Sequence, residues 1–77
     1  MSHWNYRVTR RELAGEVEFA IREVYYGPEG QIGWTVNPAP PTGENLDEVR
    51  SELGRMLEAT MQPVIDITDE NNPKEVA

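Results

Sequence analysis

The sequence contains no cysteine. The chain therefore forms no disulfide framework and offers no thiolate as a metal ligand or nucleophile. It also lacks an apolar run of the roughly 18–20 residues that a membrane-spanning helix requires. Its first residues do not combine a basic stretch with an apolar run, which is the pattern of a signal peptide. From these absences we predict a cytoplasmic protein that does not contact a membrane.

Residues typical of catalytic centres are also scarce. The single histidine is His3, and the two serines are Ser2, beside the N-terminus, and Ser51, in a helical segment far from that histidine. No glycine pattern of the phosphate-binding kind is present. The acidic residues of the helical segment form a charged face, whereas a hard cation requires ligands that converge from several directions. We predict that the protein is not an enzyme and has no cofactor or metal site.

Acidic residues outnumber basic ones in this chain. Seven basic residues stand against fourteen acidic ones, which gives a net charge of −7. This excess opposes nucleic-acid binding, because that binding depends on basic side chains that neutralise phosphates. It suits a basic protein partner or mimicry of a nucleic acid, although solubility alone also accounts for an acidic surface. Both explanations remain open from the sequence.

Alternating apolar and polar residues predict three strands in the first half of the chain. Trp4, Tyr6 and Val8 alternate with polar residues, which is the period of a β-strand. The predicted strands are residues 4–9, Glu16–Tyr26 and residues 31–36, separated by turns at residues 10–15 and 27–30. Glycine and proline mark the second of these turns.

Residues 44–61 show a helical period. Their apolar residues form one stripe, which consists of Leu46, Val49, Leu53, Met56, Leu57 and Met61. Asn45 can cap this helix, and Glu48 three residues later completes a capping box. We expect the whole stripe to pack against the strands. Three prolines in residues 37–43 favour a stiff connector between sheet and helix, or alternatively an extended recognition segment.

The complete pattern predicts an α+β fold. Apolar residues within 64–67 predict a short fourth strand, and the polar residues 68–77 predict a disordered acidic tail. Residues 1–67 then form a single domain with the order β-β-β-α-β. Its parts are a three-stranded antiparallel sheet, one amphipathic helix across one face, and the short fourth strand.

The second face of this sheet is expected to be an exposed apolar patch. Depending on the register of the strands, it carries several of Tyr26, Val24, Ala20 and Trp4. A patch of this kind is large for a small monomer, and a chain of this length has a small core. We therefore predict a homodimer.

Aromatic and arginine side chains frequently anchor protein interfaces. The candidate interaction residues are Trp4, Tyr6, Arg7, Arg22, Glu23, Tyr25, Tyr26 and Trp34. Glu23 has two interpretations. In one it forms an ion pair with a neighbouring arginine, namely Arg22, Arg7 or Arg10. In the other it is a catalytic acid that works together with Asp66.

A third interpretation of the same region is nucleic-acid binding. Four arginines lie in the first third of the chain: Arg7, Arg10, Arg11 and Arg22. With the nearby aromatic residues they could form a basic edge on which bases stack. This interpretation requires the four side chains to share one face of the sheet.

The helix motif GENLDEVRSELGRML, after three strands, resembles the small HicB-like antitoxin fold. The residues that carry the resemblance are Gly43, Glu44, Leu46, Asp47 and Glu48, and it covers approximately residues 16–67. The Pro-Asp-Leu-Pro-Gly strand end of that family is missing here, and we expect no DNA-binding extension after the last strand. The chain is also similar to small uncharacterised bacterial proteins with a WNYRV-type opening and an EVYY strand.

These observations lead to one functional prediction. The chain is expected to be a small acidic interaction module, and the resemblance implies an antitoxin-like role in which it neutralises a basic protein that acts on nucleic acid. The alternatives are a small enzyme that uses Glu23 and Asp66, and a nucleic-acid-binding module.

Overall fold

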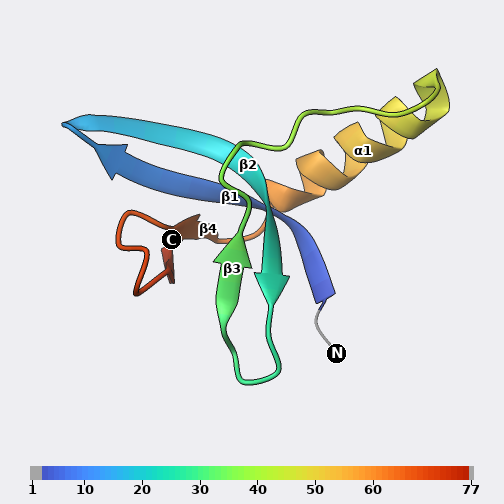
Figure 1. Ribbon diagram of the computed structural model, residues 1–77. Helices are drawn as coiled ribbons and strands as arrows, with labels where there is room; N and C mark the ends of the chain where they lie inside the picture. Colours follow the sequence, from blue (N-terminus) through green and yellow to red (C-terminus); the bar gives the residue numbers. More distant parts are fainter. Residues whose placement is uncertain (1–2, 77) are drawn as a thin grey trace.

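The computed structural model describes residues 3–76, which form a sheet and a helix (Figure 1). The elements are β1 (His3–Leu13), β2 (Glu16–Tyr26), β3 (Ile32–Trp34), α1 (Leu46–Ala59), β4 (Val64–Asp66) and β5 (Lys74–Val76). The sheet is five-stranded, in the order β3-β2-β1-β4-β5. The prediction of a three-stranded antiparallel sheet is wrong. The chain crosses over through α1, so β4 pairs parallel to β1 and the sheet is mixed.

The β1–β2 hairpin is the longest part of the sheet. Its two strands of 11 residues are paired along their whole length. Ala14 and Gly15 connect them, and both have positive φ, 52° and 83°. A two-residue turn of this kind matches the right-handed twist of the strands. The turn expected at residues 10–15 is therefore shorter, and the strands continue into a projecting tip (Figure 1).

The register of the hairpin divides its side chains between two faces of the sheet. We call the face that carries α1 the helix face. Its hairpin residues are Trp4, Tyr6, Val8, Arg10, Glu12, Val17, Phe19, Ile21, Glu23 and Tyr25. We call the opposite face the arginine face, because Arg7 and Arg22 are direct cross-strand partners on it.

The most buried apolar cluster lies on the arginine face. Val24 and Ile65 are 0% exposed, and Tyr26, Ile32 and Trp34 pack against this cluster. These residues come from β2, β3 and β4, and two strands separate β3 from β4 in the sheet. The sheet must therefore coil strongly for their side chains to meet. The expectation of an exposed apolar patch around Val24 is wrong, because this coiling encloses it.

Helix α1 begins where the sequence predicts. The side-chain oxygen of Asn45 accepts a hydrogen bond from the Glu48 N–H at 2.9 Å. The Glu48 carboxylate in turn accepts a bond from the Glu44 N–H at 3.4 Å, one residue before the position of an ideal capping box. Local side-chain chemistry therefore sets the start of the helix.

Only part of the apolar stripe of α1 is buried. Met56 of the stripe is buried, together with Ala59 outside it, whereas Leu46, Leu53 and Leu57 are 61%, 49% and 62% exposed. The helix contacts the sheet along β1, and its N-terminal end extends away from the strands (Figure 1). The expectation that the whole stripe packs on the sheet is wrong, because the contact reaches only one side of the helix.

Strand β5 lies in the segment for which we predicted a disordered tail. Residues 74–76 pair antiparallel with β4, and Glu75 forms an ion pair with Arg7 at 3.0 Å. The Asp69 carboxylate accepts the Asn71 N–H at 3.0 Å in the preceding turn. Residues 68–76 lack an apolar pattern, and their order comes from partners elsewhere in the chain.

Candidate functional site

The predicted interaction residues do not form one site. On the helix face lie Trp4, Tyr6, Glu23 and Tyr25. On the arginine face lie Arg7, Arg22, Tyr26 and Trp34. The division follows from the period of a strand, because adjacent residues point to opposite faces of the sheet.

Arg22 is buried and connects elements of the fold. Its side chain is 0% exposed, and its guanidinium donates to Thr9 Oγ1 at 2.7 Å and to Glu18 Oε1 at 3.0 Å. A longer contact of 3.5 Å reaches the carbonyl oxygen of Val36, just after β3. Arg22 therefore joins β1, β2 and the segment after β3, and it is not available to a partner.

Arg7, the cross-strand partner of Arg22, has a similar position on the same face. Its guanidinium donates to the Pro63 carbonyl at 2.6 Å, to Glu75 Oε1 at 3.0 Å and to the Tyr26 hydroxyl at 3.1 Å. Burial lowers the pKa of Arg7, but the hydrogen bonds with Glu75 and Tyr26 outweigh this effect and the pKa is raised. Arg7 therefore stays charged and connects β1 to β5.

Three aromatic residues on the helix face form what we call the aromatic shelf: Trp4, Tyr6 and Tyr25. The Trp4 ring meets Tyr6 edge to face with 5.2 Å between centroids, and it lies 6.4 Å from Tyr25. Trp4 is 43% exposed and Tyr25 is 38% exposed. Edge-to-face pairing holds these rings in fixed positions while their outer surfaces remain open.

The tyrosines of the shelf donate hydrogen bonds to carboxylates. The Tyr6 hydroxyl donates to Glu52 of α1, and this bond, followed by burial, raises the pKa of Tyr6 to about 12. The Tyr25 hydroxyl donates to Glu23 Oε1 at 2.6 Å, and this bond raises the pKa of Tyr25. Glu23 thus takes a tyrosine as its partner, and the expected ion pair with an arginine is not formed.

A small open cavity lies between the shelf and the C-terminal half of α1. Its volume is about 250 Å³, and it is lined by Trp4, Asn5, Tyr6, Arg55, Glu58, Ala59 and Gln62. Pockets for small-molecule ligands usually occupy about 300–1,000 Å³ and enclose most of the ligand. The site is therefore better suited to contact with a protein surface than to enclosure of a substrate.

The helix residues of this site were not predicted from the sequence. Glu52, Arg55 and Glu58 recur every three residues along α1. This spacing places them together on one side of a helix, next to the buried Met56 and Ala59. The signal was present, but it was interpreted only as a solvated charged face.

The carboxylates proposed for catalysis do not converge. Glu23 pairs across the sheet with Tyr6, and Asp66 pairs with Arg10. Tyr6 and Arg10 are four residues apart on β1, so the two acids lie roughly 13 Å apart along the strand direction. Catalytic carboxylate pairs typically stand about 5–10 Å apart. This arrangement does not support the proposed acid pair.

Asp66 has structural partners instead. Its Oδ1 accepts the Thr68 N–H at 2.9 Å, and its Oδ2 accepts from Arg10 at 3.0 Å. The bonds from Thr68, with a smaller effect from Arg10, lower the pKa of Asp66. Asp66 therefore stays ionised near neutral pH, which suits a turn that joins β4 to β5.

The four arginines do not form a basic edge. Arg7, Arg11 and Arg22 have the parity of the arginine face, and Arg10 has that of the helix face. Each is in an ion pair, with Glu75 for Arg7, with Glu18 for Arg11 and Arg22, and with Asp66 and Glu12 for Arg10. The nucleic-acid interpretation required one shared face and is not supported by this arrangement.

Comparisons with known proteins found no relative of this chain. The chain matches no protein-family model, no curated protein and no solved structure. Within residues 3–76, no three histidine, aspartate or glutamate side chains converge as metal ligands. The helix of the described region is too short and too polar to cross a membrane.

Proposed function

We propose that the protein is a small, acidic, non-enzymatic interaction module that binds a basic protein through its aromatic shelf. The observation that carries this proposal is the exposure of Trp4 and Tyr25 on a fully paired hairpin, where they are direct cross-strand partners. Trp and Tyr side chains frequently dominate binding energy at protein interfaces. Because strand pairing already fixes these two residues, little conformational freedom is lost on binding.

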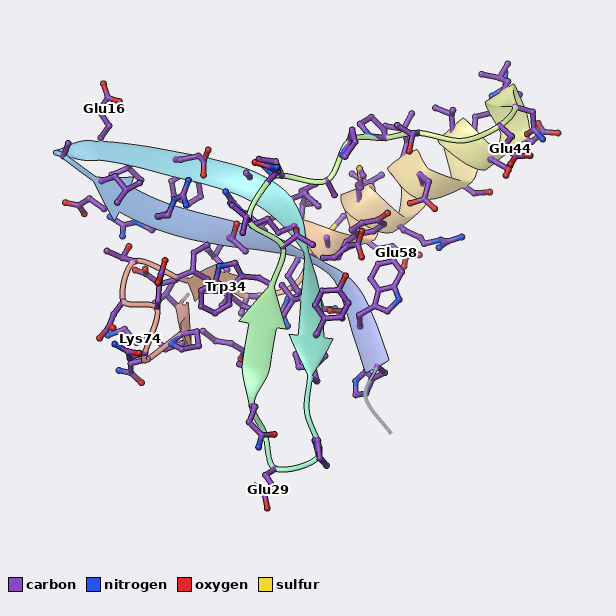
Figure 2. All side chains as sticks on the ribbon, viewed as in Figure 1. Glu16, Glu29, Trp34, Glu44, Glu58 and Lys74 are labelled. Carbon is purple, nitrogen blue, oxygen red and sulfur yellow. The ribbon has the colours of Figure 1, made fainter. Side chains whose placement is uncertain are left out.

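Acidic groups near the shelf favour a basic partner. Among residues 3–76, neither Glu23 nor Glu58 has a basic side chain within ion-pair distance. Figure 2 shows further carboxylates at the projecting ends of the molecule: Glu16 at the hairpin tip, Glu29 at the β2–β3 turn and Glu44 at the free end of α1. With a net charge of −7, the field around the protein attracts a positively charged surface.

The antitoxin-like form of this proposal states what binding does. A basic protein that acts on nucleic acid has a positively charged site, and an acidic module seated there excludes the nucleic acid. The resemblance of the α1 motif to HicB-like antitoxins is consistent with this form and remains a prediction. Inhibition of a nuclease is the activity that we propose to measure once a partner is identified.

Quantitative capture from a source lysate tests the proposal. The wild-type protein and the double variant Trp4→Ala/Tyr25→Ala are immobilised, and the retained proteins are compared by mass spectrometry at low and high salt. We expect retention of a basic protein that the shelf variant loses and that salt of about 0.5 M releases, because screening weakens charge attraction.

The matched control is Phe19→Ala. Phe19 is 62% exposed on the same hairpin and on the same face, but it lies near the tip, away from the shelf. This variant should retain the same protein as the wild type. If the shelf variant retains it equally well, or if the retained protein is acidic, the shelf is not the binding surface for a basic partner.

A further inference from the structure

Three leucines form an exposed line on α1, which we call the leucine stripe: Leu46, Leu53 and Leu57. They are 61%, 49% and 62% exposed. With Arg50 they have the spacing four, three, four, which is the repeat of a coiled-coil seam. At 100° per residue the stripe lies on the side of the helix away from Arg55, which lines the cavity beside the shelf. The stripe is therefore a second surface, separate from the proposed binding site.

Gly54 adjoins this stripe, four residues after Arg50 and three before Leu57. Glycine inside a helix is unfavourable relative to alanine. In the part of the chain that the structure describes, nothing lies within 4 Å of the position that a Cβ at residue 54 would occupy. Intramolecular packing therefore gives no reason for a glycine here. Close approach of another molecule at this position is a reason for a glycine, because a side chain would obstruct it.

We infer that two copies of the chain pair through antiparallel α1 helices along the leucine stripe. The spacing is self-complementary: when Leu46 of one copy lies opposite Leu57 of the other, Arg50 lies opposite Leu53. A two-fold axis between residues 51 and 52 generates all of these contacts. Gly54 then leaves room for the stem of Arg50 from the second copy, and its guanidinium can still reach Asp47 of its own helix, 3.7 Å away in the single chain.

The size of the surface predicts a weak dimer. The 14 residues of α1 give a helix roughly 21 Å long, and pairing along it would bury on the order of 400–500 Å² per copy. Stable complexes usually bury about 800 Å² per partner. Pairing would also cover the N-terminal end of α1, which extends beyond the sheet (Figure 1). We therefore expect an equilibrium between monomer and dimer in the micromolar range.

Salt distinguishes this dimer from the complex proposed above. Both copies carry a net charge of −7, so screening their repulsion should strengthen the dimer. The same change should weaken binding to a basic protein. The two proposals can therefore fail independently: Trp4→Ala/Tyr25→Ala should leave the dimer unchanged, and loss of the dimer need not affect the shelf.

Sedimentation velocity between roughly 5 and 500 μM measures the dimer. Leu57→Asp should raise the dimer Kd by more than about 100-fold, because the two-fold symmetry removes the contact twice. Leu57→Ala, the milder variant, should raise it by about 10-fold. The matched control is Leu13→Asp, since Leu13 is 59% exposed but belongs to the hairpin tip. A wild-type monomer at all concentrations, or a dimer that Leu57→Asp leaves intact, would overturn the inference.

Cysteine pairing tests the orientation of the helices in a chain that contains no cysteine of its own. Oxidation of the double variant Leu46→Cys/Leu57→Cys should give a disulfide-linked dimer, because each cysteine meets the other position on the second copy. The single variants should remain unlinked, since equivalent positions lie far apart in an antiparallel pair. A linked dimer of Leu46→Cys alone indicates parallel helices and contradicts the proposed arrangement.

Discussion

The arginine face and the helix face are built from the same two strands, yet they differ in what covers them. On the arginine face, the charged Arg22 and the apolar Val24 are both 0% exposed. On the helix face, Trp4 is 43% exposed and Phe19 is 62% exposed. Burial in this small sheet therefore follows coverage by β3, β4 and β5, and the hydrophobicity of a side chain alone does not decide it.

Arginine can occupy the covered face because its side chain has two parts. The aliphatic stem packs like an apolar residue, and the guanidinium requires acceptors. The Arg22 guanidinium has Thr9 and Glu18 as close acceptors, and Arg7 has Pro63 and Glu75. Paired charges of this kind are tolerated inside a protein, although they are costly when one partner is removed.

The strongest destabilisation is expected for a buried residue of the arginine face, compared with an exposed residue of α1. Ile65→Ala should lower the free energy of unfolding by about 3–4 kcal/mol, because Ile65 is fully buried on the arginine face. Leu57→Ala should cost less than about 0.5 kcal/mol at low protein concentration, because Leu57 is 62% exposed. Urea unfolding monitored by tryptophan fluorescence gives both values. Equal losses would contradict the burial of Ile65 and the exposure of Leu57.

The second prediction concerns the ion pair of the arginine face. Glu18→Ala should lower the free energy of unfolding by about 2–3 kcal/mol, because it leaves the buried Arg22 without its carboxylate. Glu16→Ala is the matched control, two residues earlier on the same strand and exposed at the hairpin tip (Figure 2). Its effect should stay within about 0.5 kcal/mol. A loss as large for Glu16→Ala would contradict a specific role of the ion pair.

The third prediction concerns the bond between β1 and α1 on the helix face. Tyr6→Phe should cost about 1–2 kcal/mol, because it removes the hydrogen bond to Glu52. The pKa of Tyr6 is raised to about 12 in the folded state, against 10.0 ordinarily. The contribution of the neutral hydroxyl is therefore complete below pH 10 and is lost as the pH rises from 10 toward 12.

Unfolding midpoints between pH 8 and 11 measure this dependence, and absorbance at about 295 nm follows the ionisation of tyrosine. The Tyr6→Phe variant should show a flatter decline than the wild type. Tyr25→Phe serves as the comparison, because its hydroxyl donates to Glu23 within β2 and does not connect two elements. If the two variants lose stability equally, the bond to α1 has no special role.

The mildest change in the free energy of unfolding is expected at the tip of the β1–β2 hairpin, which both faces share. Ala14 has a φ of 52°, a conformation that asparagine tolerates better than alanine. Ala14→Asn should therefore raise the free energy of unfolding by about 0.5 kcal/mol. Ala14→Val should lower it, because a β-branched side chain opposes positive φ. Thermal unfolding distinguishes the two, and a gain for valine would contradict the observed turn.

Local patterns in the sequence predicted local structure. The alternation at Trp4, Tyr6 and Val8 placed these residues on one face of a strand, as observed. The cap at Asn45 was confirmed by its bond to the Glu48 N–H. Such features depend on residues a few positions apart, so their physical causes are visible in a short stretch of sequence.

Features that depend on distant contacts were not predicted. Residues 74–76 have no strand pattern. Strand β5 forms because its backbone pairs with β4 and because Glu75 forms an ion pair with Arg7. The candidate interaction residues lie on β1, β2 and β3, and the sequence did not separate them between the two faces of the sheet. Arg7 and Arg22 resembled binding residues in the sequence, and only the coiling of the sheet shows that they are buried.

The ion pair between Arg7 and Glu75 has a consequence for the order of folding. The two residues are 68 positions apart in the chain. The β1–β2 hairpin is local and can form within about 10 μs, whereas Arg7 has no carboxylate partner until β5 is in place. Closure of so long a loop slows folding. We therefore expect the hairpin to form early, and the arginine face to close late, when β5 pairs with β4 and Glu75 reaches Arg7.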